Sequence, residues 1–142
     1  MTEEQQRIAI AEACGWKWFT VVAEMEYGGR VPVPLKQRRK FLAKPECIHQ
    51  GIEPAPDDMQ KREFWASGVP NHLNDLNAMH EAERIVYQTQ SADWAGRYNQ
   101  ALCDVADRAT DTLEYNWEWH ATAAQRAEAF LRTIGKWAEV AE

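Results

Sequence analysis

The last third of the chain combines a strand-like pattern with a helix-like pattern. Apolar and polar residues alternate over 113–120, as in a strand with one buried face. Apolar residues then recur at helical spacing, and Thr122 and Gln125 have the separation of a capping box. Gly135 can end this helix in the left-handed conformation. The positions expected to be buried on the helix are Ala124, Ala127, Phe130, Leu131 and Ile134.

Three further helices follow from the same periodicity. A helix is expected over 2–14, with Thr2 as its N-cap and Gly15 as the residue that ends it. Residues 70–88 and 91–109 each carry an apolar stripe at helical spacing. On the second of these helices the stripe comprises Leu73, Leu76, Met79, Ala82 and Val86. On the third it comprises Trp94, Tyr98, Ala101, Leu102, Val105 and Ala109. The short link between these two helices predicts an antiparallel pair.

Residues 16–27 alternate like a strand, and both faces are largely apolar in the first half. Such a strand fits between two layers. Gly28-Gly29 predicts a two-residue hairpin turn, after which 30–35 would return antiparallel. Pro32 and Pro34 donate no hydrogen bonds, so this second strand should lie at an edge.

The region 36–69 is expected to be an irregular insertion because it is rich in proline and glycine. It opens with a basic run, KQRRK, at 36–40. This run is either a solvated charged face or a contact for an anion. The whole pattern predicts a single α+β domain over 1–142, an α-β-α layered sandwich with a small, mainly antiparallel sheet and four or five helices.

The distribution of charge along the chain bears on which partners the protein could bind. The net charge is −6; residues 1–69 balance ten Lys/Arg against ten Asp/Glu, and 70–142 carry the whole excess. This acidity argues against general nucleic-acid binding, whereas an acidic face can meet a basic protein. The chain also holds seven tryptophans, which can fill a core or line a ligand pocket.

The compartment is expected to be the cytoplasm. Cys14, Cys47 and Cys103 are odd in number and lack paired spacing, which favours reduced thiols. The first residues lack the basic and apolar regions of a secretory signal. No stretch approaches the ~20 apolar residues of a membrane span.

Metal and cofactor chemistry finds little support. The pairs Cys47 and His49, and His80 and Glu83, could each contribute to a metal site, as could His72 beside Asp75. No second pair at ligand spacing follows Cys47 and His49. The two helix pairs are expected to form hydrogen bonds and to pack beside the core, so neither a metal nor another cofactor is expected. Polar residues beside 70–88 are expected to hydrogen-bond next to the core.

Three blocks of the sequence resemble the signature blocks of the phage "ABA sandwich" domain family. They are IAEACGWKW at 10–18, PNHLNDLNAMHEAE at 70–83 and ATAAQRAEAFLRTIGKW at 121–137, together 40 of the 142 residues. The resemblance implies an α-β-α fold, a phage origin, a place in the host (bacterial) cytoplasm and a small accessory role. The family has no established catalytic residues to carry over. The stretch 19–50 departs from its pattern.

We therefore expect a non-enzymatic phage accessory protein that counters a host defence by sequestering a small anionic nucleotide-type signal. Aromatic rings would stack on the base, and arginines would meet phosphate. The candidate ligand-binding residues are Trp16, Trp18, Arg30, Arg38, Arg39, Trp117, Trp119 and His120.

Three alternatives stay open. The acidic half could bind and inhibit a host defence protein, or the chain could hydrolyse a nucleotide with His72, His80 or Glu83. The chain could also be a purely structural or assembly module. Self-association into a homo-oligomer is compatible with either binding function.

Overall fold

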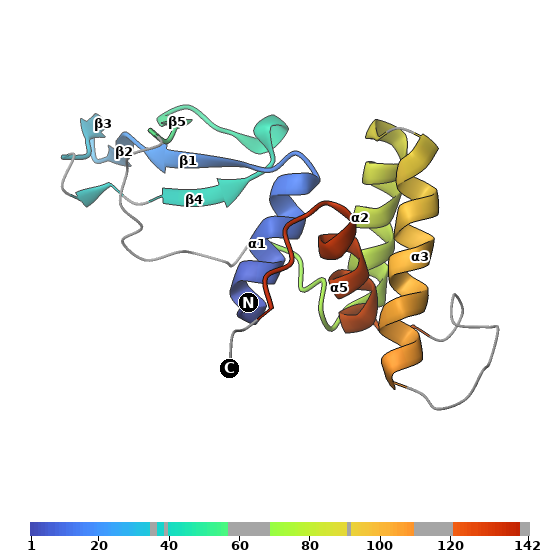
Figure 1. Cartoon of the computed structure of the whole chain (residues 1–142). Helices are drawn as coiled ribbons and strands as arrows, with labels where there is room; N and C mark the ends of the chain where they lie inside the picture. Colours follow the sequence, from blue (N-terminus) through green and yellow to red (C-terminus); the bar gives the residue numbers. More distant parts are fainter. Residues whose placement is uncertain (35–36, 39, 57–68, 91, 110–120, 140–142) are drawn as a thin grey trace. The chain divides into compact units, whose positions relative to one another are not determined.

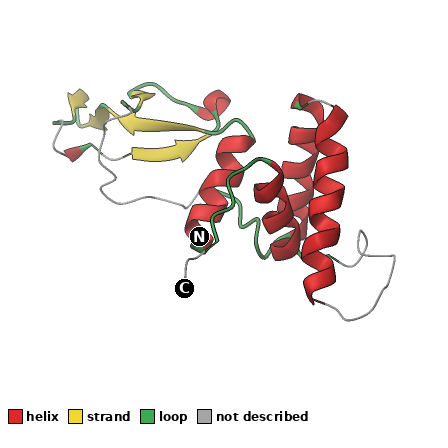
Figure 2. Ribbon diagram, viewed as in Figure 1, coloured by secondary structure: helices red, strands yellow, loops and turns green. Residues whose placement is uncertain are grey.

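Two compact units make up the chain. A computed structural model describes residues 1–34, 37–38, 40–56, 69–90, 92–109 and 121–139. Met1–Cys14 and Pro70–Glu142 form one unit, the helical unit, and Gly15–Val69 form the other, the sheet unit. In the described residues the α-helices lie in the first and the strands in the second (Figure 2). The α+β class is confirmed. The single domain over 1–142 and its α-β-α layering stay predictions, since they concern how the two units are joined.

Helix α5 is the centre of the helical unit. The helices are α1 (Glu3–Ala13), α2 (Leu76–Thr89), α3 (Ala92–Ala109) and α5 (Ala123–Thr133). Helix α5 packs against each of the other three (Figure 1). Its position explains why both alanine and large apolar residues are needed on one short helix: small side chains admit close neighbours, and Phe130 and Leu131 fill the space between them.

The core of the helical unit is closely packed around aromatic rings. The Trp94 and Tyr98 rings stack with centroids 4.9 Å apart, and Phe130 meets Trp94 edge-on at 5.8 Å. The residues of largest volume that are fully buried in this unit are Trp94, Phe130, Ile10, Met79, Leu102, Leu131 and Val86. The predicted stripes on 91–109 and 121–137 supply half of the buried core cluster. Ala124 was expected in the stripe but is exposed, and Ala101 and Ile134 are only partly buried.

The predicted helix ends are confirmed where the sequence offered a capping box. Thr2 and Gln5 form such a box at α1, and Thr122 and Gln125 form one at α5. At the other end of α5, Gly135 has φ +71°, and the amides that follow the helix donate back to its last-turn carbonyls. These bonds satisfy backbone groups that a helix end otherwise leaves open.

The predicted start of the helix over 70–88 is wrong by six residues, because α2 begins at Leu76. The Asp75 carboxylate accepts hydrogen bonds from the amides of Asn77 and Ala78, which is an N-cap. The preceding residues form a turn in which the Asp75 amide donates to the Asn71 carbonyl. Leu76, at the first helical position, is consequently exposed and not part of the buried stripe.

The sheet unit contains two small antiparallel sheets. One has the order β4–β1–β5, formed by Lys40–Ala43, Lys17–Val21 and Ile52–Pro54. The other pairs β2 (Ala23–Glu26) with β3 (Gly29–Pro32). A short 3-10 turn, η2 (Pro45–Cys47), follows β4. Two strands therefore lie in the region 36–69 that was predicted to be irregular. Three- and four-residue strands between prolines and glycines leave too short an alternation to detect in the sequence.

The strand predicted over 16–27 is broken at Val22. The amides of Val22 and Ala23 both donate to the Gly51 carbonyl, at 2.8 and 3.3 Å, so the chain changes pairing partner there. The hairpin that follows is confirmed, but its turn residues are Tyr27 and Gly28, since Gly29 already pairs with Glu26. The returning strand ends at Pro32. The strand predicted over 113–120 lies outside the described residues.

Candidate functional site

One face of the three-stranded sheet gathers aromatic and cationic side chains. Alternation along β1 puts Trp18 and Thr20 on the same side. Trp16, just before the strand, lies under Lys44 and extends this side. In the antiparallel pairing with β4, Trp18 faces Leu42 and Thr20 faces Lys40. Continuing that register by one pair brings Lys44 opposite Trp16. We call this surface, made of Trp16, Trp18, Lys40 and Lys44, the Trp–Lys face.

Each tryptophan of the Trp–Lys face carries a lysine on its ring. Lys40 Nζ lies 4.9 Å from the centre of the Trp18 ring, and Lys44 Nζ lies 5.8 Å from that of Trp16. Both indole rings are half-buried. An exposed cation–π contact contributes only about 0.5–1 kcal/mol. The contacts are thus weak enough for a ligand to displace the lysines, yet they hold two positive charges beside two aromatic surfaces.

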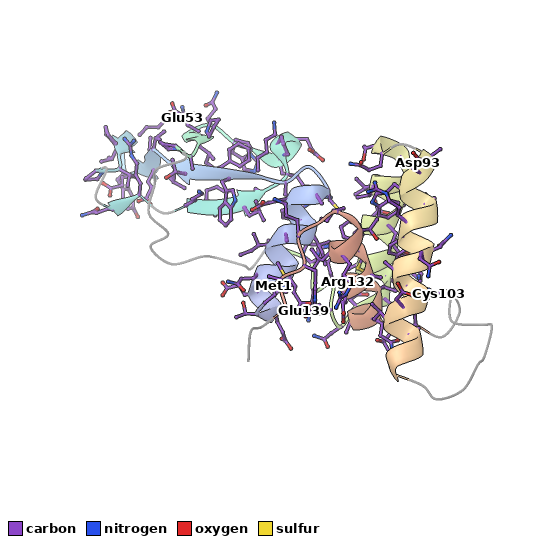
Figure 3. All side chains as sticks on the ribbon, in the orientation of Figure 1. Met1, Glu53, Asp93, Cys103, Arg132 and Glu139 are labelled. Carbon is purple, nitrogen blue, oxygen red and sulfur yellow. The ribbon has the colours of Figure 1, made fainter. Side chains whose placement is uncertain are left out.

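The surroundings of the Trp–Lys face are partly polar. Thr20 and Leu42 are buried on the same side of the sheet. The Thr20 hydroxyl has no hydrogen-bond partner in the described residues, which is a cost for a buried polar group. On β5, the exposed Glu53, labelled in Figure 3, pairs with Thr20, so the strand register places it on this side as well. A ligand here would meet two ammonium groups and one carboxylate.

The structure brings together only part of the predicted ligand-binding set. Trp16 and Trp18 share a face, as their spacing predicted. Arg30 lies on the exposed hairpin strand β3, in the other sheet. Arg38 Nε donates to the Val33 carbonyl at 3.0 Å, which holds the turn before β4. The remaining predicted residues, Arg39, Trp117, Trp119 and His120, lie outside the described residues.

Lys40 and Lys44 were missed as candidate ligand-binding residues. Arg38 and Arg39 were chosen from the basic run for their phosphate geometry, but the cations beside the tryptophans come from strand β4 and its end. The signal that could have found them was the alternation of Lys40, Leu42 and Lys44. This alternation has the same two-residue period as Trp16 and Trp18. That the lysines and the tryptophans share a face becomes clear only when the strands are paired.

The helical unit holds a second polar cluster, centred on Glu83. This carboxylate accepts hydrogen bonds from the Tyr98 hydroxyl and from Arg126 Nη1, the latter at 3.1 Å. His80 Nδ1 lies 3.1 Å from its other oxygen. Glu83, Tyr98 and Arg126 are buried, whereas the His80 side chain is half-exposed. Burial, and after it the negative charge of Glu83, raise the pKa of Tyr98 above its usual range.

The Glu83 cluster links three helices of the helical unit. It joins α2, α3 and α5 through side chains from each of them. Arg126 Nε also donates to the Ala121 carbonyl. A buried carboxylate with this many donors satisfies the prediction that polar residues beside the core form hydrogen bonds. Removing one partner would leave a buried charge exposed to an apolar surrounding, which is costly.

His72, the other histidine considered for catalysis, is buried. The pKa of His72 is lowered from 6.5 to about 4, first by burial and then by the charge of Arg7, while the charge of Asp75 acts in the opposite direction. Its Nδ1 has no hydrogen-bond partner in the described residues. At neutral pH His72 is therefore neutral. In the part of the chain that the structure describes, no three acidic, histidine or cysteine side chains gather as metal ligands do.

The two units differ sharply in charge. The sheet unit holds nine Lys/Arg and seven Asp/Glu, a net charge of +2, and the helical unit holds seven and fifteen, a net charge of −8. The acidity of the chain thus belongs to the unit that lacks the Trp–Lys face. The net charge of the whole chain, −6, conceals a slightly basic unit.

Comparisons with protein-family models, with curated proteins and with solved structures find no match to this chain. The resemblance to phage ABA sandwich proteins therefore stays a prediction. Among the described residues, no helix is both long enough and apolar enough to cross a membrane.

Proposed function

We propose that this protein binds a small anionic nucleotide-type ligand on its Trp–Lys face and acts without catalysis. The observation that carries the proposal is two cation–π contacts on one side of a sheet, Lys40 over the Trp18 ring and Lys44 over the Trp16 ring. Indole rings stack on nucleobases, and neighbouring ammonium groups attract phosphate. The net positive charge of the sheet unit favours the same ligands.

The wider role that we propose is sequestration of a host defence signal by a phage accessory protein in the bacterial cytoplasm. It rests on the resemblance of the three sequence blocks to phage ABA sandwich proteins. A protein that only sequesters its ligand needs affinity but no acid–base pair beside the ligand. This agrees with the composition of the Trp–Lys face, which has two aromatic rings and two lysines.

Isothermal titration calorimetry tests the binding proposal. The probes are adenosine and guanosine monophosphates, the corresponding triphosphates, and cyclic and linear dinucleotides. We expect heat of binding with at least one probe, and a loss of about 5- to 150-fold in affinity for W18A, because base stacking on an aromatic ring contributes about 1–3 kcal/mol. The absence of binding heat with every probe would overturn the proposal.

The chain offers a matched control for the lysines. Lys17 is exposed on β1, one residue from Trp18, so its side chain lies on the opposite face of the strand. K17M and K44M remove the same charge from the same sheet. We expect K44M to weaken binding and to flatten its salt dependence, and K17M to leave both nearly unchanged. Equal effects of the two variants would indicate general electrostatics and not a site.

An acidic inhibitor of a host protein is the second candidate function. It is favoured by the net charge of −8 on the helical unit, which would attract a basic surface. Affinity capture from bacterial lysate at low and high salt tests it. A partner retained at low salt and released at high salt is expected, and capture of no protein at low salt would count against it.

Nucleotide hydrolysis is the third candidate, and the cluster of His80 and Glu83 is what favours it. Glu83 orients His80 by a contact at Nδ1, as a carboxylate does for a catalytic histidine. Incubation of the same nucleotides with the protein, followed by denaturation and chromatography, tests this function. Recovery of every nucleotide intact would exclude it for those substrates.

A further inference from the structure

We infer that the ligand of the Trp–Lys face is a dinucleotide, with two bases and a charge distributed between them. This inference rests on the proposed function, since it names the ligand class of the same face. The observation behind it is repetition. The face has two aromatic–ammonium pairs, one formed by Trp16 and Lys44 and the other by Trp18 and Lys40.

The two pairs are spaced along the strand as consecutive units of a ligand would be. Trp16 and Trp18 are two residues apart on one face, which corresponds to about 6.6–6.8 Å along an extended strand. Aromatic side chains that bind single-stranded nucleic acids accept successive bases in this way. A mononucleotide stacks on one ring only and leaves the other pair unused. A dinucleotide can occupy both.

The charges also favour one phosphate per nucleoside. Lys40 and Lys44 lie over different rings, so their two positive charges are divided along the face. A triphosphate concentrates its negative charge at one end and can approach one of them closely. Glu53, exposed on the β5 side, repels additional phosphate there. A phosphodiester-linked pair of nucleotides distributes its charge to match.

The extent of the face argues for a short ligand. In the described residues of the sheet unit, the tryptophans are Trp16 and Trp18, and strand β1 continues as Phe19 and Thr20, which are buried. A long single strand needs a basic groove that follows its backbone. The net charge of +2 on the sheet unit is small for that purpose.

Calorimetric titration of the whole chain distinguishes the possible outcomes. The probes are adenosine monophosphate, the linear dinucleotide pApA, cyclic di-adenosine monophosphate and an eight-nucleotide adenosine strand. We expect one of the dinucleotides to bind about 5- to 150-fold more tightly than the mononucleotide, the gain that one additional stacked base provides. The linear and cyclic arms show which linkage the face accepts.

Single substitutions of the rings sharpen the test. W16A and W18A should each reduce dinucleotide affinity towards that of the mononucleotide, whereas W16F and W18F, which keep an aromatic ring, should retain most of it. K17M provides the charge control on the opposite face. Circular dichroism of each variant confirms that its fold is retained, and the phenylalanine variants keep the test valid if an alanine variant does not fold.

Each result decides between the two levels of the proposal. Equal affinity for mononucleotide and dinucleotide overturns the dinucleotide inference and leaves nucleotide binding in place. A steady rise in affinity from dinucleotide to the eight-nucleotide strand also overturns it, because the ligand would then be a single strand. The absence of binding by all four probes overturns both the inference and the proposed function.

Discussion

The helical unit and the sheet unit both contain aromatic and charged side chains, but they differ in how deeply these side chains are buried. In the helical unit, Trp94 and Tyr98 stack in the core, and Glu83 forms a buried ion pair with Arg126. In the sheet unit, Trp16 and Trp18 are half-buried and lysines lie over them. Buried rings and charges stabilise a fold, whereas accessible ones are available to a ligand. Under the proposed function, the helical unit would provide most of the stability and the sheet unit would bind the ligand.

The helical unit also has the larger apolar core of the two. Most of the buried apolar residues described belong to the helical unit, and the sheet unit contributes Phe19, Val33, Leu42 and Val69. Apolar burial contributes about 25 cal/mol per Å², so the free energy of unfolding should reside mainly in the helices. The sheet unit depends more on backbone pairing and on turns.

The largest effect that could break this comparison is expected at Glu83. E83A removes the buried carboxylate that pairs with Arg126, and breaking a buried ion pair should cost about 3–5 kcal/mol of unfolding free energy. Urea denaturation followed by far-UV circular dichroism measures the loss. E81A is the control, because its pair with Arg84 is exposed and should matter far less. Similar losses for both variants would refute a stabilising role of the cluster.

A smaller effect, confined to the sheet unit, is expected at Gly51. Its φ is +86°, and a Cβ there would lie 2.7 Å from the Ala23 carbonyl oxygen. G51A should therefore cost about 2–4 kcal/mol, from the left-handed conformation together with the clash. G28A has a similar φ with open space around it, so only the conformational part should remain.

Hydrogen exchange separates the two units in this experiment. G51A should lower amide protection within 17–54 and leave protection within 76–133 nearly unchanged, if the sheet unit opens by itself. Equal protection in G51A and G28A would contradict the proposed clash. Loss of protection throughout the chain would show that the sheet unit also supports the helices.

The smallest effect concerns pH and tests the helical unit alone. Because the pKa of His72 is lowered from 6.5 to about 4, the unfolded chain binds a proton at this residue more readily than the folded chain. The stability from neutral His72 is complete above pH 6.5 and is lost as the pH falls towards 4. We expect this loss to amount to about 1–3 kcal/mol.

Denaturation between pH 7 and 4 compares H72Q with the unsubstituted chain. H72Q should flatten the pH dependence, because glutamine does not titrate, whereas H49Q, which alters an exposed histidine of the sheet unit, should leave it steep. An unchanged pH dependence in H72Q would show that carboxylates alone determine the acid sensitivity.

Much of the helical unit could be predicted because its signals are local. A capping box needs residues three apart, and Thr122 with Gln125 provides one. A helical stripe lies within one element, as on α3. The start of α2 was mispredicted because the apolar period extends back to Leu73 while Asp75 caps the helix. A side chain that can bind the backbone overrode the periodicity there.

The candidate site could be predicted only in part. The spacing of Trp16 and Trp18 placed them on one face, but it could not show that Arg30 lies in the other sheet. The ligand-binding role of Arg30 and Arg38 stays a prediction. Arg38 is used by the Val33 carbonyl, a contact that only the folded turn creates. Lys40 and Lys44 became candidates through the pairing of β1 with β4, and register between strands distant in sequence depends on contacts that no local window contains.

The sequence by itself determined the α+β class, the helix caps and the stripes that form the helical core, because each depends on residues a few positions apart. The tertiary structure decided which cations join which rings. It also decided that the acidity belongs to one unit and that Glu83 lies among three helices. These properties come from residues far apart in the chain, whose distances are determined by packing and strand pairing and not by local conformational preference.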